Sequence, residues 1–442
     1  MYLLYTFALS LLFIALLPYF VYQAFRHGKY RGSFKQRMGF LPDQLRSDGR
    51  STIWIHTVSV GEFNAARPLI SQLGNNFPDH RIVVSTITLT GQRLAASATE
   101  SFDKTFYFPF DWNFTVRRAL NHVNPDVVVI LETELWPNFL RECHRRGIIT
   151  VIANGRISPG SLKGYMRVRR FISRVLADVS LLAMQSEADA ERIISLGAPQ
   201  SRVRVCGNLK YDVVNKDDDA AFNELCQNID EQFALSSSQN LIVAGSTAQG
   251  EEKILLEAFR SIRNEKRLEN ARLLFAPRHP ERFEEVAGLI RQANFSFSRR
   301  SQPSAQSDST DVILLDTIGE LGAAYRFAAI VFVGGSLVPR GGHNIIEPAA
   351  CAKPVIVGPH MENFRAIAAD FTAADALVQI KSDSNQTESL AREFTRLLVD
   401  RKDAAQMGAR AREILLSNRG ATLCTIEAIQ KMMEMMGKNR LA

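Results

Sequence analysis

The chain has 442 residues, of which 46% are hydrophobic and 22% are charged. This composition excludes a disordered or collagen-like chain and suits roughly two globular domains of about 100–200 residues each. The formal net charge of +7 favours anionic partners such as nucleotides or acidic lipids. Five cysteines without CxxC spacing argue against a disulfide framework or structural zinc and favour a reducing, cytosolic compartment.

Residues 1–25 are predicted to form an uncleaved membrane anchor. The stretch is almost entirely apolar and carries no charged side chain, and about 20 such residues suffice for a helix to cross a bilayer core. Basic residues follow it in the segment 26–37, whereas a signal peptide usually begins with them. By the positive-inside rule, the rest of the chain is expected in the cytoplasm, with the basic segment against anionic headgroups. The sequence leaves open whether the helix spans the membrane or lies in one leaflet.

After the anchor, short apolar runs alternate with amphipathic stretches, which predicts two doubly wound α/β domains. We expect a first domain at 26–210 and a second at 211–442, linked through the segment 208–239. The polar stretch 298–309 is expected to be a surface loop. The C-terminal tail is expected to be helical, with a last helix that can reach back to the first domain.

The expected strands are rich in Val and Ile, as is typical of buried parallel sheets. Ligands of doubly wound sheets bind beyond the carboxyl ends of the strands. We therefore expect the functional loops to follow the strands and to face a cleft between the two domains. The strands are predicted at 53–57, 81–87, 105–108, 126–131, 148–153 and 180–184, and at 241–244, 272–276, 312–315, 330–333, 354–357 and 376–380.

Two acidic motifs follow strands of the first domain. In HTVSVGE (56–62), Glu62 opens a helix, where the helix dipole favours a carboxylate that can serve as a general base. A Glu that only caps the helix explains this motif equally well. In LETELWPN (131–138), Glu132 and Glu134 leave a strand together, beside an apolar surface suited to sugar or lipid. An acidic helix start is the alternative, although strand exits are the ligand side of such a sheet.

Two strand exits of the second domain have features that suit phosphate binding. Ser246 and Thr247 follow a strand and precede a helix, so backbone N–H groups there can meet phosphate oxygens. In APRHPERF (276–283), Arg278 and His279 lie at another strand exit, where Arg offers a forked, permanently charged donor set. A surface ion pair is the alternative for Arg278.

Glycine-rich segments complete the predicted site of the second domain. The GGS segment 334–336, which includes Gly335 and Ser336, ends a strand. Its two glycines allow the backbone to approach a ligand closely. In GGHNIIEPAA (341–350), Asn344 and Glu347 are three residues apart, and Glu347 can hold ribose hydroxyls through charge-assisted hydrogen bonds. A capping arrangement without a ligand is the alternative.

Several common cofactor motifs are absent from the sequence. No GxxxxGK[ST] or GxGxxG segment occurs, which argues against P-loop hydrolysis and a nicotinamide cofactor. A metal site is not indicated either, since we find no HExxH motif and no DxD pair in a loop that suggests one. We therefore expect no cofactor and no metal.

Together, the motifs resemble those of the 3-deoxy-D-manno-octulosonic acid (Kdo) transferases of lipopolysaccharide synthesis. The resemblance covers nearly the whole chain, although Thr57 stands where the family usually has Ala. The motifs follow the apolar anchor in the order KYRGSFKQRMGF (29–40), HTVSVGE, LETELWPN, NGRIS (154–158), QSEADAERIISLGA (185–198), GNLKYD (207–212), APRHPERF, TIGEL (317–321) and GGHNIIEPA.

The resemblance implies the two-domain GT-B glycosyltransferase fold and an inverting transfer of Kdo. The implied donor is CMP-Kdo, the acceptor is a tetraacyl lipid A precursor (lipid IVA), and the place is the bacterial inner membrane. It assigns the general base to Glu62 and transition-state support to Glu132 and Lys210. The implied CMP contacts are Pro277, Arg278, Ile318, Gly319, Glu320, Asn344, Ile345, Ile346 and Glu347, and Ser246, Thr247, His279, Gly335 and Ser336 are further candidates for donor phosphate contacts.

Two other hypotheses remain. The first is another GT-B enzyme that uses a UDP-sugar, similar to a lipid A disaccharide synthase or an epimerase. The second is a non-enzymatic module that binds anionic lipid, but such a module has no use for carboxylates at two strand exits. A nucleic-acid partner is not expected, because no basic helix with interleaved aromatics occurs outside the juxtamembrane segment.

Overall fold

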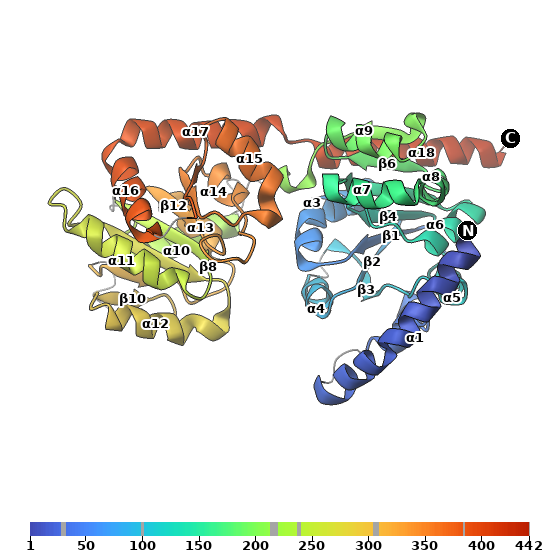
Figure 1. Ribbon diagram of the computed structural model, residues 1–442, viewed down its shortest axis with the longest axis horizontal. Helices are drawn as coiled ribbons and strands as arrows, with labels where there is room; N and C mark the ends of the chain where they lie inside the picture. Colours follow the sequence, from blue (N-terminus) through green and yellow to red (C-terminus); the bar gives the residue numbers. More distant parts are fainter. Residues whose placement is uncertain are drawn as a thin grey trace. The chain divides into compact units, whose positions relative to one another are not determined.

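The computed structural model describes residues 1–27, 32–98, 101–212, 220–236, 240–303, 309–382 and 385–441. The chain folds as two compact units (Figure 1). Unit 1 comprises Met1–Asp212 with Asn418–Ala442, and unit 2 comprises Val213–Ser417. The second domain expected from the sequence, 211–442, differs from unit 2 because the C-terminal segment belongs to unit 1.

Unit 1 is built on a seven-stranded parallel sheet with the strand order β3-β2-β1-β4-β5-β6-β7. The chain winds outward from β1 in one direction and then from β4 in the other, so the order reverses between these two strands. The strands are β1 (Thr52–Thr57), β2 (Arg81–Thr86), β3 (Lys104–Tyr107), β4 (Val127–Leu131), β5 (Ile149–Gly155), β6 (Leu181–Met184) and β7 (Val203–Val205).

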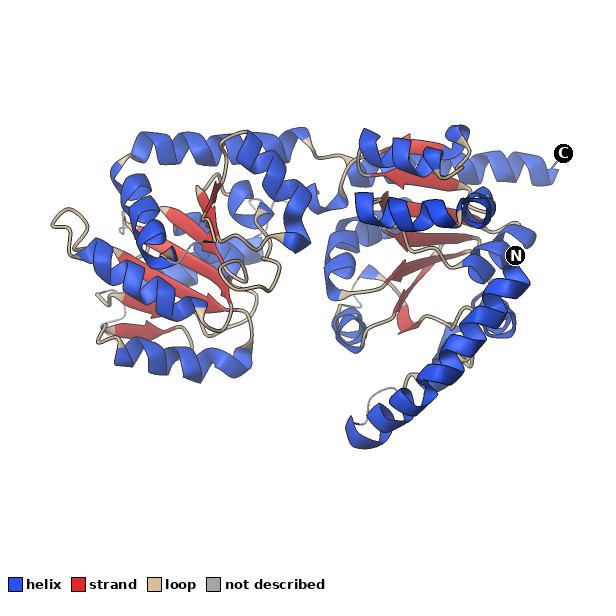
Figure 2. Ribbon diagram, in the orientation of Figure 1, coloured by secondary structure: helices blue, strands red, loops and turns tan. Residues whose placement is uncertain are grey.

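Helices cover both faces of this sheet (Figure 2), and each face carries its own hydrophobic core. Trp54 of β1 points into one core, whereas Ile53 and Ile55 point into the other. This alternation follows from the two-residue period of a strand and explains why the whole run is apolar. The helices are α1 (Tyr2–His27), α2 (Phe34–Arg37), α3 (Val60–Asn76), α4 (Leu89–Ser97), α5 (Asn113–Val123), α6 (Pro137–Arg145), α7 (Pro159–Arg167), α8 (Arg169–Ala177), α9 (Glu187–Ser195) and α18 (Ala421–Leu441).

Unit 2 repeats the plan with a second seven-stranded parallel sheet, in the order β10-β11-β9-β8-β12-β13-β14. Here the order reverses between β8 and β12. The strands are β8 (Leu241–Thr247), β9 (Arg272–Pro277), β10 (Phe297–Arg299), β11 (Val312–Leu314), β12 (Ile330–Val333), β13 (Val355–Val357) and β14 (Val378–Gln379). The helices are α10 (Ala220–Phe233), α11 (Glu251–Arg263), α12 (Phe283–Gln292), α13 (Leu321–Phe327), α14 (Ile346–Ala350), α15 (Arg365–Ala373), α16 (Gln386–Val399) and α17 (Arg401–Ser417).

All twelve predicted strands are confirmed, but two of the predicted irregular segments are wrong in part. The expected link 208–239 contains helix α10, whose buried Cys226, Ile229 and Phe233 form a helical apolar stripe. The expected loop 298–309 begins inside β10, which was missed because its sequence, FSR, is not an apolar run. Residues 213–219, 237–239 and 304–308 of these segments, and Lys29 and Arg31 of the basic segment, lie outside the described residues.

The C-terminal helix α18 is fastened to unit 1. Ile426 and Ile429 join the core on the α3 face of the sheet. Asp212 accepts hydrogen bonds from the backbone N–H groups of Gly420 and Thr422, at 2.8 and 2.5 Å. A disulfide joins Cys206 to Cys424. The cysteine pattern had argued against disulfides, and a pair 218 residues apart leaves no local spacing to detect.

The N-terminal helix α1 lies along unit 1 with one face docked (Figure 1). Tyr2 Oη donates to Asp178 at 2.5 Å, Asn138 Nδ2 donates to Thr6 Oγ1 at 2.9 Å, and Trp112 Nε1 donates to Ser10 Oγ at 3.1 Å. The docked residues recur every four positions, so they share one side of the helix. The window Tyr2–Tyr19 is apolar and long enough to cross a membrane. Its other side exposes Leu3, Leu4, Phe7, Leu11, Leu12 and Ile14.

Candidate active site

The acidic motifs of unit 1 meet where the strand order reverses. Glu62 follows β1 and Glu132 follows β4, and these strands are parallel neighbours. Parallel strands end at the same edge of a sheet, and the reversal point is the usual ligand crevice of this architecture. The two glutamates interact electrostatically, and Lys210 interacts with both of them. The structure therefore brings together the three residues that the resemblance assigns to catalysis.

Glu62 lies in the first turn of α3 and takes part in a capping arrangement. Its Oε2 accepts from the Val58 N–H at 2.7 Å and its Oε1 accepts from Ser59 Oγ at 3.1 Å, while Ser59 caps the helix. The capping interpretation is thus realised, but a carboxylate has about four acceptor positions, so two bonds leave room for a proton. Burial raises the pKa of Glu62 to about 7, and the neighbouring Glu132 adds to the rise. A pKa near neutrality suits a general base.

Glu132 is held in an unusual conformation directly after β4. Its φ of 56° lies in the left-handed region, which costs free energy for a residue with a side chain and often marks a functional site. The Arg156 Nε donates to Glu132 Oε2 at 3.0 Å. Nearby, burial raises the pKa of Glu134, and the charge of Glu132 raises it further.

Lys210 is positioned by the end of β5. The Leu209 N–H donates to Asn154 Oδ1 at 2.9 Å, and the Lys210 N–H donates to Asn208 Oδ1 at 3.0 Å. Burial lowers the pKa of Lys210, while Glu132 and Glu62 raise it. Sequence reasoning assigned no role to Asn154 or Arg156, although both lie in the NGRIS motif. Only the pairing of β4 with β5 places them beside the glutamates.

In unit 2, a buried carboxylate occupies the point where the strand order reverses. Glu251 of α11 is fully buried and accepts from the backbone N–H groups of Ala248, Gly335, Ser336 and Leu337, at 2.8 to 2.9 Å. Burial raises the pKa of Glu251, and the four N–H bonds oppose this rise. The carboxylate therefore ties the loop after β12 to the turn after β8.

This tie corrects part of the predicted phosphate site. The N–H groups of Gly335 and Ser336 already donate to Glu251, so they are not available to a ligand. The Ser336 hydroxyl is fully buried, donating to the Val333 carbonyl and accepting from the Gly358 N–H. Thr247 is fully buried as well, whereas Ser246 is half-buried with a φ of 55°. Thr247 and Ser336 are therefore closed to solvent, whereas Ser246 is partly open.

Basic side chains gather above that turn. Pro277 ends β9, and Arg278 and His279 follow it as exposed residues. Both lie near enough to His343 to interact with it, and burial together with these charges lowers the pKa of His343 to about 4. His343 packs on Gly335, where an added Cβ would lie 2.8 Å from the imidazole. The position of the His343 imidazole therefore depends on glycine at position 335.

The TIGEL segment precedes α13 and is partly open to solvent. Ile318 is 80% exposed, and Gly319 has a φ of 91°. Glu320 is paired with Arg300, which donates to it at 2.9 and 3.2 Å, and also accepts from the Thr317 hydroxyl. The exposed Ile318 side chain is available to stack on a ligand, whereas the Glu320 carboxylate is engaged within unit 2.

The side chains of Asn344 and Glu347, three residues apart in the sequence, are hydrogen-bonded to each other. Asn344 Nδ2 donates to Glu347 Oε1 at 3.0 Å, and Asn344 Oδ1 accepts from the Ile346 N–H at 3.0 Å. Both contacts lie at the start of α14, whose N-cap residue, Ile345, has no side-chain capping hydrogen bond. Ile345 and Ile346 are buried, so only their backbone can meet a ligand.

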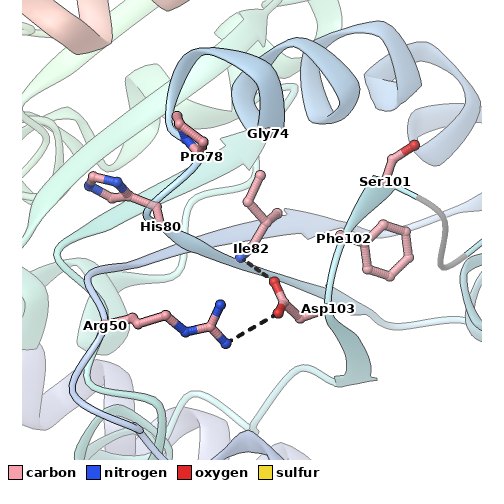
Figure 3. Close-up of a pocket in the computed structure, with 8 residues that line it drawn as sticks. All are labelled: Arg50, Gly74, Pro78, His80, Ile82, Ser101, Phe102 and Asp103. Atoms are coloured by element: carbon pink, nitrogen blue, oxygen red, sulfur yellow. Dashed lines mark hydrogen bonds and ion pairs between the residues drawn. The ribbon is translucent and has the colours of Figure 1, made fainter.

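A surface pocket of about 330 Å³ lies elsewhere in unit 1 (Figure 3). Its walls include Arg50, Ile82 and Asp103, which precede or begin β1, β2 and β3. Asp103 accepts from the Ile82 N–H at 2.9 Å and from Arg50 at 3.4 Å. The pocket is therefore at the amino-terminal edge of the sheet, opposite the edge that carries Glu62 and Glu132.

Comparison with known proteins agrees with the motif pattern. Residues 32–213 match the family model described as 3-deoxy-D-manno-octulosonic-acid transferase (kdotransferase). A 3-deoxy-D-manno-octulosonic acid transferase of Haemophilus influenzae is 35% identical over 408 residues, which are 92% of this chain and 92% of that protein. A 3-deoxy-D-manno-octulosonic acid transferase of Chlamydophila psittaci is 31% identical over 79% of each chain.

Solved structures support the fold. The crystal structure of UDP-GlcNAc 2-epimerase from Neisseria meningitidis bound to UDP-GlcNAc has a TM-score of 0.58 and is 13% identical, covering 86% of this chain and 100% of its own. At this identity, the likeness shows the fold alone. The predicted fold class is confirmed: two Rossmann-like domains of the GT-B type, preceded by an apolar N-terminal helix.

Proposed function

The chain belongs to the 3-deoxy-D-manno-octulosonic acid transferase family and is a glycosyltransferase, and from this premise we propose that its donor is CMP-Kdo and its acceptor lipid IVA. The observation that carries the proposal is the cluster at the carboxyl edge of unit 1. There, Glu62 has a pKa near neutrality and lies beside Glu132 and Lys210. A carboxylate that can take a proton at neutral pH is what attack by an alcohol requires.

In the proposed reaction, Glu62 removes the proton from a primary hydroxyl of the acceptor. The hydroxyl oxygen forms a bond to the anomeric carbon of Kdo from the face opposite the phosphate, so the configuration inverts. The bond from that carbon to the phosphate oxygen breaks, and its electron pair leaves with CMP. The proton ends on Glu62, and the products are CMP and the acceptor that carries Kdo.

The leaving phosphate gains charge as this bond breaks, and fixed cationic donors stabilise such charge. We assign this role to Arg278. Arg278 is exposed and permanently charged, next to the neutral imidazole of His343. Because Gly335 and Ser336 are bound to Glu251, the side chains contribute more of this stabilisation than the glycine motif suggested.

The nucleotide preference gives the first test. We expect CMP to raise the melting temperature of the full-length protein more than UDP does at equal concentration. A ligand at 100 times its dissociation constant stabilises the folded state by about 2.7 kcal/mol. Arg278→Ala should reduce the CMP shift, whereas Arg291→Ala, on the surface of unit 2, should not. A larger shift with UDP would contradict the donor assignment and support the UDP-sugar alternative.

The N-terminal helix is proposed to hold the enzyme at the bacterial inner membrane, with both units in the cytoplasm and the basic segment 26–37 at the headgroups. The exposed apolar side of α1 supports this placement, since burying each such side chain in lipid gains about 1.5–3 kcal/mol. Because Tyr2, Thr6 and Ser10 bind unit 1, the beginning of the helix stays beside the catalytic unit.

A variant in which Leu3, Leu4, Phe7 and Leu11 are all replaced by serine should therefore be released from anionic lipid vesicles in a flotation assay. The docked face of α1 is unchanged in this variant, so its circular dichroism spectrum should match that of the wild type. Serine at Val399 and Leu416, which are also exposed in unit 2, serves as the control and should leave flotation unchanged. Undiminished flotation of the α1 variant would refute this attachment.

A further inference from the structure

The catalytic cluster of unit 1 contains more acidic than basic groups. Glu62, Glu132 and Glu134 supply three carboxylates, and Lys210 and Arg156 supply two cations. The proposed donor, however, is itself an acid, with a carboxylate on the sugar and a phosphate on the nucleotide. An anionic donor that approaches three carboxylates needs a cation that is free to meet it.

Arg156 is held rigidly at the edge of this cluster. Its backbone N–H donates to Thr133 Oγ1 at 2.9 Å, and the same hydroxyl donates to the Arg156 carbonyl at 2.5 Å. These reciprocal bonds join the loop after β5 to the loop after β4. The position of the Arg156 backbone is therefore fixed relative to Glu132.

The side chain of Arg156 is only partly used. Its Nε donates to Glu132 at 3.0 Å, and its side chain is 55% exposed, against 16% for Glu132. Within the described part of the chain, the terminal nitrogens of its guanidinium make no other hydrogen bond or ion pair. Glu132 thus orients one edge of the guanidinium and leaves the terminal N–H groups open to solvent.

Lys210 is less suited to the same task. It is half-buried, and its charge is offset by interactions with both Glu132 and Glu62. An exposed guanidinium keeps its charge at all relevant pH values and matches the two oxygens of a carboxylate with two parallel N–H groups. Of the two cations, Arg156 is the one that fits a planar carboxylate.

We propose that Arg156 binds the carboxylate of the sugar-acid donor and selects it over an uncharged sugar. The inference rests on the proposed function and names a substrate contact within the same site. Glu132 then has two roles. It supports the transition state, and it orients Arg156 to bind the carboxylate of the donor.

The test compares two donors in the full-length protein: CMP-Kdo and its analogue with the carboxylate converted to a carboxamide. Wild type should favour CMP-Kdo in kcat/KM by roughly 10–100-fold, the range of one charged hydrogen-bonded contact. In Arg156→Gln, kcat/KM should fall for CMP-Kdo and change within about twofold for the carboxamide, so that the preference disappears. Arg156→Lys should be intermediate, because it keeps the charge and loses the fork. The KM for the lipid acceptor should not change.

The other outcomes are distinct. If Arg156 acts only through Glu132, Arg156→Gln lowers kcat/KM equally for both donors. The preference for CMP-Kdo then remains, which overturns the proposal. A rise in the KM for the acceptor with the donor preference intact also overturns it and assigns the arginine to an acceptor phosphate. If wild type uses neither donor, the proposed function itself fails. Arg145→Gln, an exposed arginine at the far end of α6, is the matched control and should behave as wild type.

Discussion

Glu62→Gln is expected to lower turnover of CMP-Kdo by about 100-fold or more, the scale of a lost general base. Glutamine keeps the shape of the side chain and one acceptor oxygen, so the start of α3 should remain folded. Binding of CMP-Kdo, measured by calorimetry, should be unchanged because the role assigned to Glu62 is to take a proton from the acceptor hydroxyl and not to bind the donor. Turnover close to wild type would rule out the assigned role.

The pH dependence provides an independent check on the same residue. The base must be ionised, and burial raises the pKa of Glu62 to about 7. The kcat/KM of the wild type should therefore fall on the acid side of about pH 7, by tenfold for each further pH unit. The residual activity of Glu62→Gln should lack this limb.

A matched control separates catalysis from capping. Asp189 lies in the first turn of α9, three residues after the capping Ser186, as Glu62 lies three residues after Ser59, and its carboxylate accepts from the Ser186 hydroxyl. Asp189→Asn should reproduce any loss that comes from a weakened helix start in unit 1. If it lowers turnover as much as Glu62→Gln does, the general-base assignment fails.

Glu251→Ala is expected to destabilise unit 2 by about 3 kcal/mol or more. The substitution leaves four backbone N–H groups without their acceptor, and each buried unsatisfied donor costs about 1–3 kcal/mol before water enters. Glu251→Gln should not restore the stability, because the NH₂ group of glutamine would face two of the backbone N–H groups that now donate to the carboxylate. In the fraction of Glu251→Ala that folds, CMP binding should weaken as well, because the loop after β12 loses its hydrogen bonds to the Glu251 carboxylate.

Two signals can locate this effect. The three tryptophans, Trp54, Trp112 and Trp136, all belong to unit 1. In urea titrations, Glu251→Ala should therefore shift the circular dichroism transition to lower urea, while the tryptophan fluorescence transition moves less. Glu257→Ala, at an exposed position of the same helix α11, should change neither transition. Equal stability of Glu251→Ala and wild type would show that the buried carboxylate is dispensable.

Sequence predicted the sheets well because their strands are buried on both faces. Val127–Leu131 and residues 241–244 are continuous apolar runs, which predict buried strands. Strands β7 (VRV) and β10 (FSR) have a charged or polar residue in a run of only three, so they lack this signal, whereas the equally short β11 (VIL) and β13 (VIV) are wholly apolar. Helix α10 was taken for a link because polar residues surround its stripe of three buried side chains.

The site was predicted in its parts but not in its connections. The positions of Glu62 and Glu132 follow from strand exits, which a sequence reveals. The neighbours of those residues depend on which strands pair, so the contact between Arg156 and Glu132 could not be foreseen. The occupied N–H groups of Gly335 and Ser336 also escaped prediction, because their acceptor, Glu251, lies 84 residues away from Gly335 in the sequence.

The most direct test is to incubate the purified full-length protein with CMP-Kdo and lipid IVA and to analyse the lipid by mass spectrometry. Our account predicts acceptor that is heavier by one or more whole Kdo residues, one CMP released for each, and almost no product with Glu62→Gln. Unmodified acceptor from folded wild type in lipid vesicles, with CMP-Kdo left intact, would contradict it.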